Sequence, residues 1–283
     1  MLSCETRIEK LVSNYTKELK GVSQSARAEI EEMILTIKSL NNRSALYMHS
    51  QTLAPHEISI LNEMIAIRRK GIPLQYILGK VYFYGLEFKI SPGVFIPRPE
   101  TELMIDYVIK EYSGCNNLNI LEIGTGSGVI SICLTKFLAT SKIIATDISR
   151  KALELARHNA KLHKVKIDFI QANLFDFLSP RAKFDLIISN PPYVGSDEYK
   201  FLAPEVKLEP RKALIGGKYG YEFTLQLVSE AVAYIKEQGK VIVEIDYRAK
   251  DVYIARLGNK FKLKFLPDFN LKQRVMVVEK NYG

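Results

Sequence analysis

Apolar residues in the first quarter of the chain recur at intervals of three and four positions, which is the spacing of one helix face. This pattern predicts helices over residues 5–20, 25–40 and 55–69. Pro55 suits the first turn of the third helix, because its missing N–H would have no partner there. The expected inward side chains are Ile8, Leu11, Val12, Tyr15, Leu19, Ile30, Met33, Ile34, Ile37, Ile58, Leu61, Met64 and Ile65. The pattern predicts a small helical bundle over residues 1–78.

The next stretch is rich in aromatic residues, glycine and proline. Residues 81–90 alternate around Gly85, which predicts a short β-hairpin. Residues 94–102 contain prolines and run into a helix, so we expect a stiff connection and not a flexible tether. We place a hairpin linker at residues 79–97 and a second domain at residues 98–283.

From residue 119 onward, short apolar runs alternate with helical segments. The predicted strands cover residues 120–123, 143–147, 167–170, 184–188, 241–245, 261–266 and 274–279. The predicted helices cover residues 129–137, 149–163 and 222–237, and the second is capped by Ser149 and buries Ala152, Leu155 and Ala156. This alternation predicts an α/β fold with a mostly parallel, doubly wound sheet, which binds ligands at the carboxyl ends of its strands.

Composition narrows the class of protein. A hydrophobic content of 47% and a charged content of 25% are ordinary for a soluble globular chain, and no apolar run is long enough to span a membrane. The N-terminus does not begin a signal peptide. Cys4, Cys115 and Cys133 are widely spaced, and His49 and His56 are expected at the surface or in the core, so neither disulfides nor a metal site is expected. These features predict a cytoplasmic protein.

The segment Gly124-Thr125-Gly126-Ser127-Gly128 lies between a predicted strand and a predicted helix. Its glycines allow a tight turn and a close approach of the backbone to a ligand. Asp147 ends the next strand, where it can accept hydrogen bonds from a ribose diol. A dinucleotide fingerprint would have a third glycine where the chain has Val129, so the spacing favours another cofactor. No P-loop sequence occurs, which excludes that site.

The segment Ser189-Asn190-Pro191-Pro192-Tyr193 follows the apolar strand 184–188. Its prolines stiffen the backbone and push Asn190 and Pro191 to extended geometry. The carbonyls there cannot join a continuing ladder or helix, so they point outward together with an amide and an aromatic ring. In isolation the segment would indicate a rigid turn, but a glycine turn in the same sheet favours a ligand site.

These two segments resemble known methyltransferase motifs. Gly-x-Gly-x-Gly resembles the first motif of class I S-adenosylmethionine-dependent methyltransferases, and Asn-Pro-Pro-Tyr resembles the signature of those that act on amino or amide nitrogens. The resemblance implies a seven-stranded Rossmann-like sheet with one antiparallel strand, and S-adenosylmethionine as cofactor. Glu122 would lie near its methionine end and Asp147 on its ribose. The Asn190 oxygen and the Pro191 carbonyl would accept hydrogen bonds from a planar NH2 group, on which Tyr193 would stack.

Three more stretches resemble the HemK/PrmC family of release-factor glutamine N5-methyltransferases. They are Pro73-Leu74-Gln75-Tyr76-Ile77-Leu78-Gly79, Phe95-Ile96-Pro97-Arg98-Pro99-Glu100-Thr101-Glu102, and Glu209-Pro210 followed by Ala213-Leu214-x-Gly216-Gly217. The resemblance implies methyl transfer to the glutamine of the Gly-Gly-Gln loop in class I peptide chain release factors, with residues 1–78 binding the release factor. We expect a monomer with no stable nucleic-acid complex and no membrane association.

The same resemblance implies roles for residues outside the two central segments. Phe95, Pro97 and Thr101 would border the cofactor or the active site, while packing in a linker is the alternative for Phe95 and Pro97. Asn173, beside Leu174, stands where relatives often have an acid that contacts adenine, and its amide oxygen can accept the same hydrogen bond.

A second departure from the family pattern follows the fifth strand. Relatives often have Glu-Ile-Gly where this chain has Glu244-Ile245-Asp246, and we expect that loop to lie outside the chemistry.

Two other functions stay open at this stage. A net charge of +9 suits an acidic or RNA-bound partner as well as a solvated surface, so an amino-methyltransferase acting on adenine N6, cytosine N4 or guanine N2 is one alternative. A binding domain that retains the fold without catalysis is the other.

Overall fold

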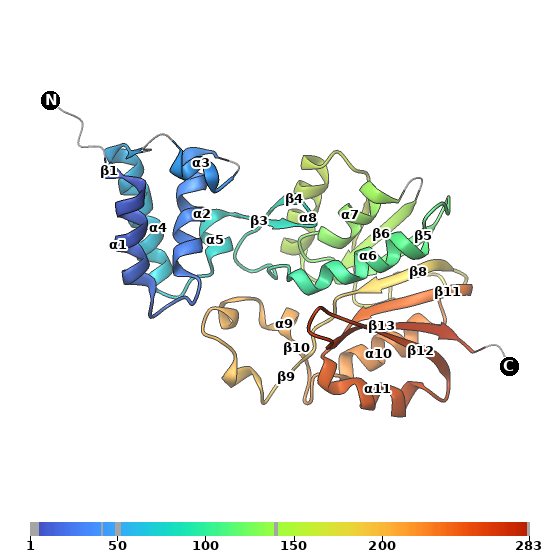
Figure 1. Cartoon of the computed structure of the whole chain (residues 1–283). Coiled ribbons are helices and arrows are strands. Elements are labelled where there is room, and N and C mark those ends of the chain that lie inside the picture. Colours follow the sequence, from blue (N-terminus) through green and yellow to red (C-terminus); the bar gives the residue numbers. More distant parts are fainter. Residues whose placement is uncertain (1–5, 41, 49–51, 139–140, 282–283) are drawn as a thin grey trace. The chain divides into compact units, whose positions relative to one another are not determined.

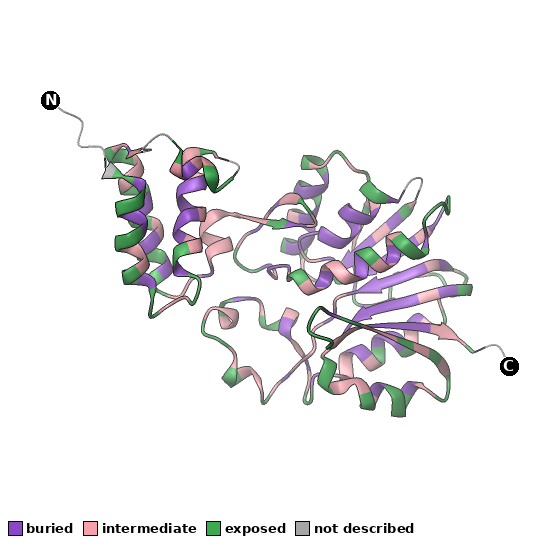
Figure 2. Cartoon of the chain, in the orientation of Figure 1, coloured by how far each residue is buried: buried purple, intermediate pink, exposed green. Residues whose placement is uncertain are grey.

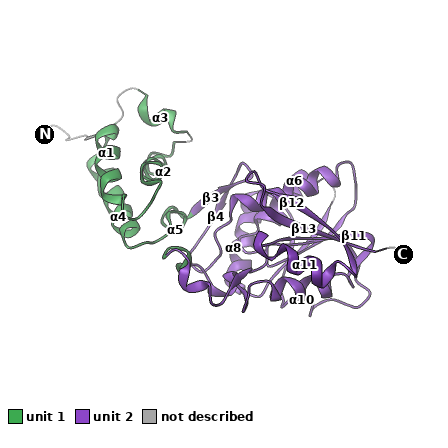
Figure 3. Cartoon of the chain, turned by 60° about the horizontal axis from the view of Figure 1, so that its bottom comes forward, with its two compact units in different colours: residues 1–79, 204–208 green, residues 80–203, 209–283 purple. Residues whose placement is uncertain are grey.

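The computed structural model describes residues 6–40, 42–48, 52–138 and 141–281. It has two compact units, which comprise Met1–Gly79 with Pro204–Leu208, and Lys80–Ala203 with Glu209–Gly283 (Figure 3). Cys4 and His49 lie outside the described residues. Cys115 and Cys133 are free cysteines, and His56 is exposed.

Three helices of the first unit confirm the prediction: α1 (Ile8–Leu19), α2 (Ala26–Lys38) and α4 (Pro55–Arg69). Their apolar residues form one core, drawn in purple in Figure 2. Four of the expected inward residues are only partly buried against it: Tyr15, Ile37, Ile58 and Met64. The remaining elements are too short to give a periodic signal; they are β1 (Thr6–Arg7), α3 (Ser44–Tyr47), β2 (Thr52–Leu53) and α5 (Leu74–Leu78).

A buried arginine holds two separate parts of the first unit together. Arg68 donates to both carboxylate oxygens of Glu29, at 2.7 and 3.0 Å, and to the carbonyl of Ile72 at 3.1 Å. It also forms an ion pair of 2.8 Å with Glu205. Glu205 belongs to the segment 204–208, which joins the first unit although the chain before and after it belongs to the second. The helical periodicity alone does not predict this role.

The second unit begins with the predicted hairpin. Strands β3 (Lys80–Phe83) and β4 (Leu86–Lys89) pair antiparallel around Tyr84 and Gly85, which both have positive φ. The proline-containing segment then leads through the short 3-10 helix η1 (Pro99–Thr101) into α6 (Glu102–Glu111).

The main sheet of the second unit has seven strands in the order β12-β13-β11-β8-β5-β6-β7 (Figure 1). Strand β13 runs opposite to the other six strands, which confirms the predicted fold with one antiparallel strand. The strands are β5 (Asn119–Ile123), β6 (Lys142–Asp147), β7 (Asp168–Gln171), β8 (Phe184–Ser189), β11 (Ile235–Glu244), β12 (Phe261–Pro267) and β13 (Gln273–Lys280). A short parallel pair, β9 (Val194–Gly195) and β10 (Ile215–Gly217), lies outside this sheet.

Helices cover both faces of the sheet, which is why the central strands β5 and β8 are buried on both sides. Leu186 and Ile188 of β8 pack into one core with α6 and α7 (Val129–Phe137), whereas Ile187 between them packs into the other. That second core includes α10 (Glu222–Ala231) and α11 (Lys250–Leu257). The other helical segments are α8 (Arg150–Leu162), α9 (Arg211–Leu214), η2 (Tyr199–Phe201), η3 (Val206–Leu208) and η4 (Tyr247–Ala249).

The prediction of a helix over residues 222–237 was wrong beyond Ala231. Helix α10 ends at Ala231, and Ile235 already pairs with Phe184 in the sheet. Helical propensity therefore yields to strand pairing and to burial of Ile235 in the core. In α8, Leu153 is buried where Leu155 was expected, and Leu155 is only partly covered.

Within the described ranges, no helix is long and apolar enough to cross a membrane. No group of three or more His, Cys, Asp or Glu side chains in these ranges could hold a metal ion.

Candidate active site

Four strands of the second unit end side by side at one edge of the sheet. Ile123 pairs with Thr146 and with Ser189, and Ser189 also pairs with Val243. Because these strands are parallel, the residues that end them or directly follow them meet at the same edge of the sheet. They are Gly124, Asp147, Asn190 and Glu244. The structure thus brings together the predicted glycine turn, acid and Asn-Pro-Pro-Tyr segment, and adds Glu244.

The glycine turn needs its glycines for two different reasons. Gly124 and Gly126 have φ of 73° and 57°, and a Cβ atom at either would meet no heavy atom within 4 Å. Gly128 has φ of 85°, and its Cβ would lie 3.1 Å from side-chain atoms of Ala156 and Ile132. All three glycines therefore allow a positive φ that other residues rarely adopt. Gly124 and Gly126 do so beside open space, whereas Gly128 also allows the turn to pack closely on neighbouring helices.

Asp147 fixes the shape of this turn. Its Oδ2 accepts a hydrogen bond from the Gly126 N–H at 2.9 Å, and its Oδ1 accepts one from the Ser149 N–H at 2.8 Å. Burial raises the pKa of Asp147, and these backbone hydrogen bonds oppose that rise. The carboxylate that was predicted to bind a ribose is therefore already oriented by the backbone.

Glu122 is a fully buried carboxyl beneath the turn. Its Oε2 accepts from Thr125 Oγ1 at 2.7 Å and from the Ser131 N–H at 3.2 Å. Burial raises its pKa to about 7. Its Oε1 is buried without a hydrogen-bond partner among the described residues, and so is Ser127 Oγ. Unpaired buried acceptors are uncommon in proteins and indicate a site that a ligand can complete.

A buried asparagine, Asn159, ties the glycine turn to the hairpin. Its Oδ1 accepts from the Lys89 N–H at 2.8 Å, and its Nδ2 donates to the carbonyls of Lys89 and Ser127 at 3.0 and 2.9 Å. Asn159 lies at a buried position of α8 with no motif around it, so its role is not predictable from the sequence.

Asn173 and Leu174 follow β7 at the same edge of the sheet, since Gln171 pairs with Asp147. Leu174 is buried and has φ of 50°, which is unusual for a leucine. Asn173 is exposed, and its N–H donates to Asp176. The strained backbone turns the chain at this point, and the Asn173 side chain stays accessible to a ligand.

The Asn-Pro-Pro-Tyr segment is held by close backbone contacts. Ser189 Oγ donates to the Ile123 carbonyl at 2.8 Å, which joins the segment to the end of β5. A Cβ on Gly216 would lie 2.3 Å from the Pro192 carbonyl oxygen, and one on Gly220 would lie 2.3 Å from that of Tyr193. The Ala-Leu-x-Gly-Gly motif therefore needs glycine because its backbone packs directly against the Asn-Pro-Pro-Tyr backbone.

The Asn190 side chain is oriented by two residues from distant parts of the chain. Its Nδ2 donates to Thr101 Oγ1 at 2.9 Å, and Thr101 Oγ1 donates to Glu244 Oε2 at 2.6 Å. The Tyr193 hydroxyl donates to Glu244 Oε1 at 3.1 Å. Since Nδ2 is engaged by Thr101, the Asn190 oxygen is directed to the opposite side of the amide, where it can accept.

The charge state of Glu244 follows from its surroundings. Burial raises its pKa to about 7, against the hydrogen bonds from Thr101 and Tyr193, which favour the charged form. Burial and the neighbouring Glu244 also raise the pKa of Tyr193 well above its ordinary value. Tyr193 is thus a neutral hydroxyl near neutral pH.

Comparison with known proteins identifies the family. Residues 10–79 match the PrmC N-terminal domain, and residues 85–207 match the methyltransferase small domain. Release factor glutamine methyltransferase of Fusobacterium nucleatum is 38% identical over 257 residues, which cover 89% of this chain and 73% of the relative. The protein of that name from Dictyoglomus turgidum is 42% identical, and the match covers 81% of this chain and 79% of the relative. The one from Aquifex aeolicus is 32% identical, and the match covers 97% of this chain and 99% of the relative.

The chain belongs to the release factor glutamine methyltransferase family. This confirms the predicted resemblance and the prediction of a methyltransferase. Solved structures agree on the fold. A methyltransferase from Pyrococcus furiosus has a TM-score of 0.51 and 20% identity, and covers 79% of this chain and 96% of its own. Ribosomal protein L11 methylase from Lactobacillus delbrueckii has a TM-score of 0.50 and 21% identity, and covers 68% and 84%.

Two of the stretches that resemble the family meet in the second unit. Buried Glu209 accepts from the Ile96 N–H at 3.0 Å through Oε2 and from the Arg98 guanidinium through Oε1. That guanidinium lies over the Phe95 ring, 5.1 Å from its centre. Pro97 is buried between these contacts. The packing holds the chain that leads to Thr101.

The expectation for the loop after the fifth strand needs correction, because Glu244 belongs to the Asn190 network. Asp246, the departure from the family pattern, also has a physical role. Its Oδ1 accepts from the Arg248 N–H at 2.9 Å and so caps η4, and its carboxylate pairs with the Arg248 guanidinium. Arg248 also binds both carboxylate oxygens of Glu198 at 2.8 Å.

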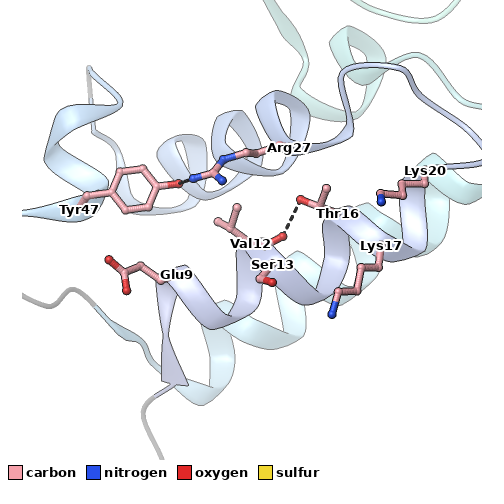
Figure 4. Close-up of a pocket in the computed structure, with 8 residues that line it drawn as sticks. All are labelled: Glu9, Val12, Ser13, Thr16, Lys17, Lys20, Arg27 and Tyr47. Atoms are coloured by element: carbon pink, nitrogen blue, oxygen red, sulfur yellow. Dashed lines mark hydrogen bonds between the residues drawn. The ribbon is translucent and has the colours of Figure 1, made fainter.

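A separate groove of about 520 Å³ lies in the first unit (Figure 4). It is bordered by Glu9 and Lys17 of α1, by Lys20 just after that helix, and by Arg27 of α2, whose guanidinium donates to the Tyr47 hydroxyl at 3.4 Å. None of the site residues predicted from the sequence borders it. The groove belongs to the part of the chain that matches the family's N-terminal domain.

Proposed function

We propose that this chain transfers a methyl group from S-adenosylmethionine to the side-chain nitrogen of the glutamine in the Gly-Gly-Gln loop of class I peptide chain release factors. The observation that carries the proposal is the hydrogen-bonded chain from Asn190 through Thr101 to Glu244. It orients an amide oxygen at the sheet edge where methyltransferases of this fold react.

The residues around the glycine turn fit the cofactor. Open space beside Gly124 and Gly126 admits a ligand close to the backbone, and Asp147 can accept from its ribose. The unpaired oxygen of Glu122 suits the ammonium group at the methionine end of S-adenosylmethionine. We add the remaining predicted contacts to this site: Phe95, Thr101, Thr125, Ser127, Gly128, Asn173, Leu174 and Asn190. When bound, S-adenosylmethionine supplies a methyl group on a positively charged sulfur.

The Asn-Pro-Pro-Tyr segment would hold the acceptor nitrogen. The Asn190 oxygen and the Pro191 carbonyl each accept one N–H of the glutamine amide, which increases electron density on a nitrogen that is otherwise a poor nucleophile. Pro192 keeps the backbone extended, and the Tyr193 ring lies against the flat amide. Alignment of two bound groups contributes ~7–11 kcal/mol to the lowering of such barriers. No strong base is required, since the nitrogen becomes acidic as it is methylated.

We assign binding of the release factor in part to residues 1–78, the predicted N-terminal domain. The groove beside α1 supports this assignment, because Lys17 and Lys20 at its border provide positive charge that suits an acidic segment of a protein partner, whereas Arg27 is paired with Glu31. Release factors act on ribosomes, so the proposal also implies a cytoplasmic protein.

The test is transfer of labelled methyl groups to a purified class I release factor, followed by mass spectrometry of the Gly-Gly-Gln peptide. We expect label on that glutamine, and none on a release factor whose glutamine is replaced by alanine. Label in ribosomal RNA or DNA but not in the release factor would overturn the proposal in favour of a nucleic-acid amino-methyltransferase.

A further inference from the structure

The turn between β12 and β13 exposes apolar side chains to an unusual degree. Phe269 is 100% exposed and Leu271 is 81% exposed. We call residues 268–272 the hairpin tip; they are the dark red turn in Figure 1. Two large apolar side chains held in water on one short turn indicate a surface that another molecule covers.

The hairpin tip is an ordered structure. Asp268 Oδ1 accepts from the N–H groups of Asn270 and Lys272 at 2.8 and 3.0 Å, and Asp268 Oδ2 accepts from Arg274 Nε at 3.1 Å. The Asp268 N–H donates to the Lys272 carbonyl at 2.8 Å. Leu271 has φ of 60°, a conformation that leucine rarely adopts. The turn therefore displays its apolar groups in a fixed arrangement, which lowers the entropic cost of binding.

The hairpin tip lies at the same edge of the sheet as the candidate active site. Strand β13 runs antiparallel to β11 with Val275 opposite Glu244, and the Ile245 N–H donates to the Arg274 carbonyl at 2.8 Å. The start of β13 therefore adjoins the end of β11, where Glu244 contacts Tyr193.

Contacts join the hairpin tip to the neighbouring loops. The Lys272 amino group lies 4.8 Å from the centre of the Tyr247 ring, and the Arg274 guanidinium lies 5.2 Å from it. Next to Tyr247, Arg248 binds Glu198, which directly precedes η2. Phe201 of η2 is 79% exposed. We call Phe201, Phe269 and Leu271, with the loops that carry them, the apolar rim.

We propose that the apolar rim, led by the hairpin tip, docks on the folded surface of the protein substrate next to its methyl-accepting glutamine. This inference rests on the proposed function. A side chain that enters the site from a folded protein brings that protein's surface against the loops around the entrance. The rings of Phe201 and Phe269 could stack on bases, but Leu271 beside Phe269 is aliphatic and could not, so the mixed apolar surface fits a protein better than a nucleic acid. Arg274 and Arg248, which could reach phosphates, are paired with Asp268, Asp246 and Glu198.

The test uses Phe269→Ala and Leu271→Asn, singly, in the full-length chain. Both side chains are exposed, and asparagine tolerates the positive φ of position 271. We expect the KM and the dissociation constant for full-length release factor to rise about tenfold or more, while kcat at saturating release factor and the affinity for S-adenosylmethionine stay unchanged. The matched control is Leu162→Ala, also exposed, at the end of α8 and therefore near the opposite edge of the sheet.

The outcomes separate the two proposals. If the wild-type chain does not methylate the release factor, the proposed function fails and this inference fails with it. If the wild type methylates and both variants keep its KM, only the hairpin-tip inference is overturned. Weaker binding of a single-stranded RNA oligonucleotide by the variants, with KM for the release factor unchanged, would also overturn it.

Discussion

The hydroxyl of Thr101 and the carboxylate of Glu244 lie 2.6 Å apart, although 143 positions separate them in the chain. Thr101 ends the 3-10 helix η1, and Glu244 ends strand β11. The same hydroxyl accepts from the Asn190 amide at 2.9 Å. A single threonine thus determines which way the Asn190 amide faces.

Thr101→Val removes this hydroxyl with little change of shape. We expect kcat to fall by about 5- to 150-fold, because loss of a buried hydrogen-bond partner costs about 1–3 kcal/mol and the Asn190 amide can then rotate. Thr101→Ser keeps the hydroxyl and should retain most activity. Single-turnover methylation measures both variants. Equal rates for valine and serine would show that the hydroxyl does not orient Asn190.

Asn190→Ala removes one of the two acceptors proposed for the substrate amide. We expect kcat to fall by about 10²–10³-fold, as when one preorganised group is lost from other active sites. The dissociation constant for S-adenosylmethionine, measured by calorimetry, should change far less. The complementary variant is Asn173→Ala, at the exposed position predicted to contact adenine, which should weaken cofactor binding more than it lowers kcat. Equal losses of turnover and affinity in Asn190→Ala would contradict its role.

Glu122 and Glu244 should make stability depend on pH. Burial raises the pKa of each to about 7, above the ordinary value of 4.5. The folded chain therefore holds these protons more tightly than the unfolded chain, so their contribution is present below pH 4.5 and lost as pH rises through about 7. Each shift corresponds to at most about 3 kcal/mol.

Glu122→Gln isolates this effect. Measured relative to the wild type, the free energy of unfolding of this variant should be larger at pH 8 than at pH 5, by up to about 3 kcal/mol, because only the wild type loses stability as pH rises. Urea unfolding at the two pH values measures the difference, and Glu244→Gln should behave alike. Parallel pH profiles for wild type and variants would rule out a raised pKa in the folded state.

Gly216→Ala tests the backbone packing against the Asn-Pro-Pro-Tyr segment. Its Cβ would lie 2.3 Å from the carbonyl oxygens of Pro192 and Gly220, so the backbone must shift. We expect the unfolding free energy to fall by about 1–3 kcal/mol and kcat to fall with it. Gly21→Ala is the control, because a Cβ there meets nothing within 4 Å. Thermal denaturation and methylation rates of the two variants should differ clearly, and matching values would argue against tight packing at Gly216.

Most of the fold can be read from local patterns. The alternation of apolar runs and helical segments predicts a parallel sheet, and a parallel sheet aligns the carboxyl ends of its strands. The turn from Gly124 to Gly128 and the Asn190 segment each follow a strand directly, and Asp147 ends one, so their meeting at one edge is predictable. The helix over residues 222–237 failed because Ile235 pairs with Phe184, a residue far away in the chain.

Contacts between segments that are distant in the sequence cannot be predicted from its local patterns. Glu209 binds Arg98, Asn159 joins the hairpin to the glycine turn, and Glu244 reaches Asn190 through Thr101. None of these residues has a local spacing that indicates its partner. The sequence by itself determined the family, the sheet and the reactive segment, because local conformation and strand order follow from periodicity and motif. Only the tertiary structure decided how Asn190 is oriented, because hydrogen bonds between buried groups depend on packing in three dimensions.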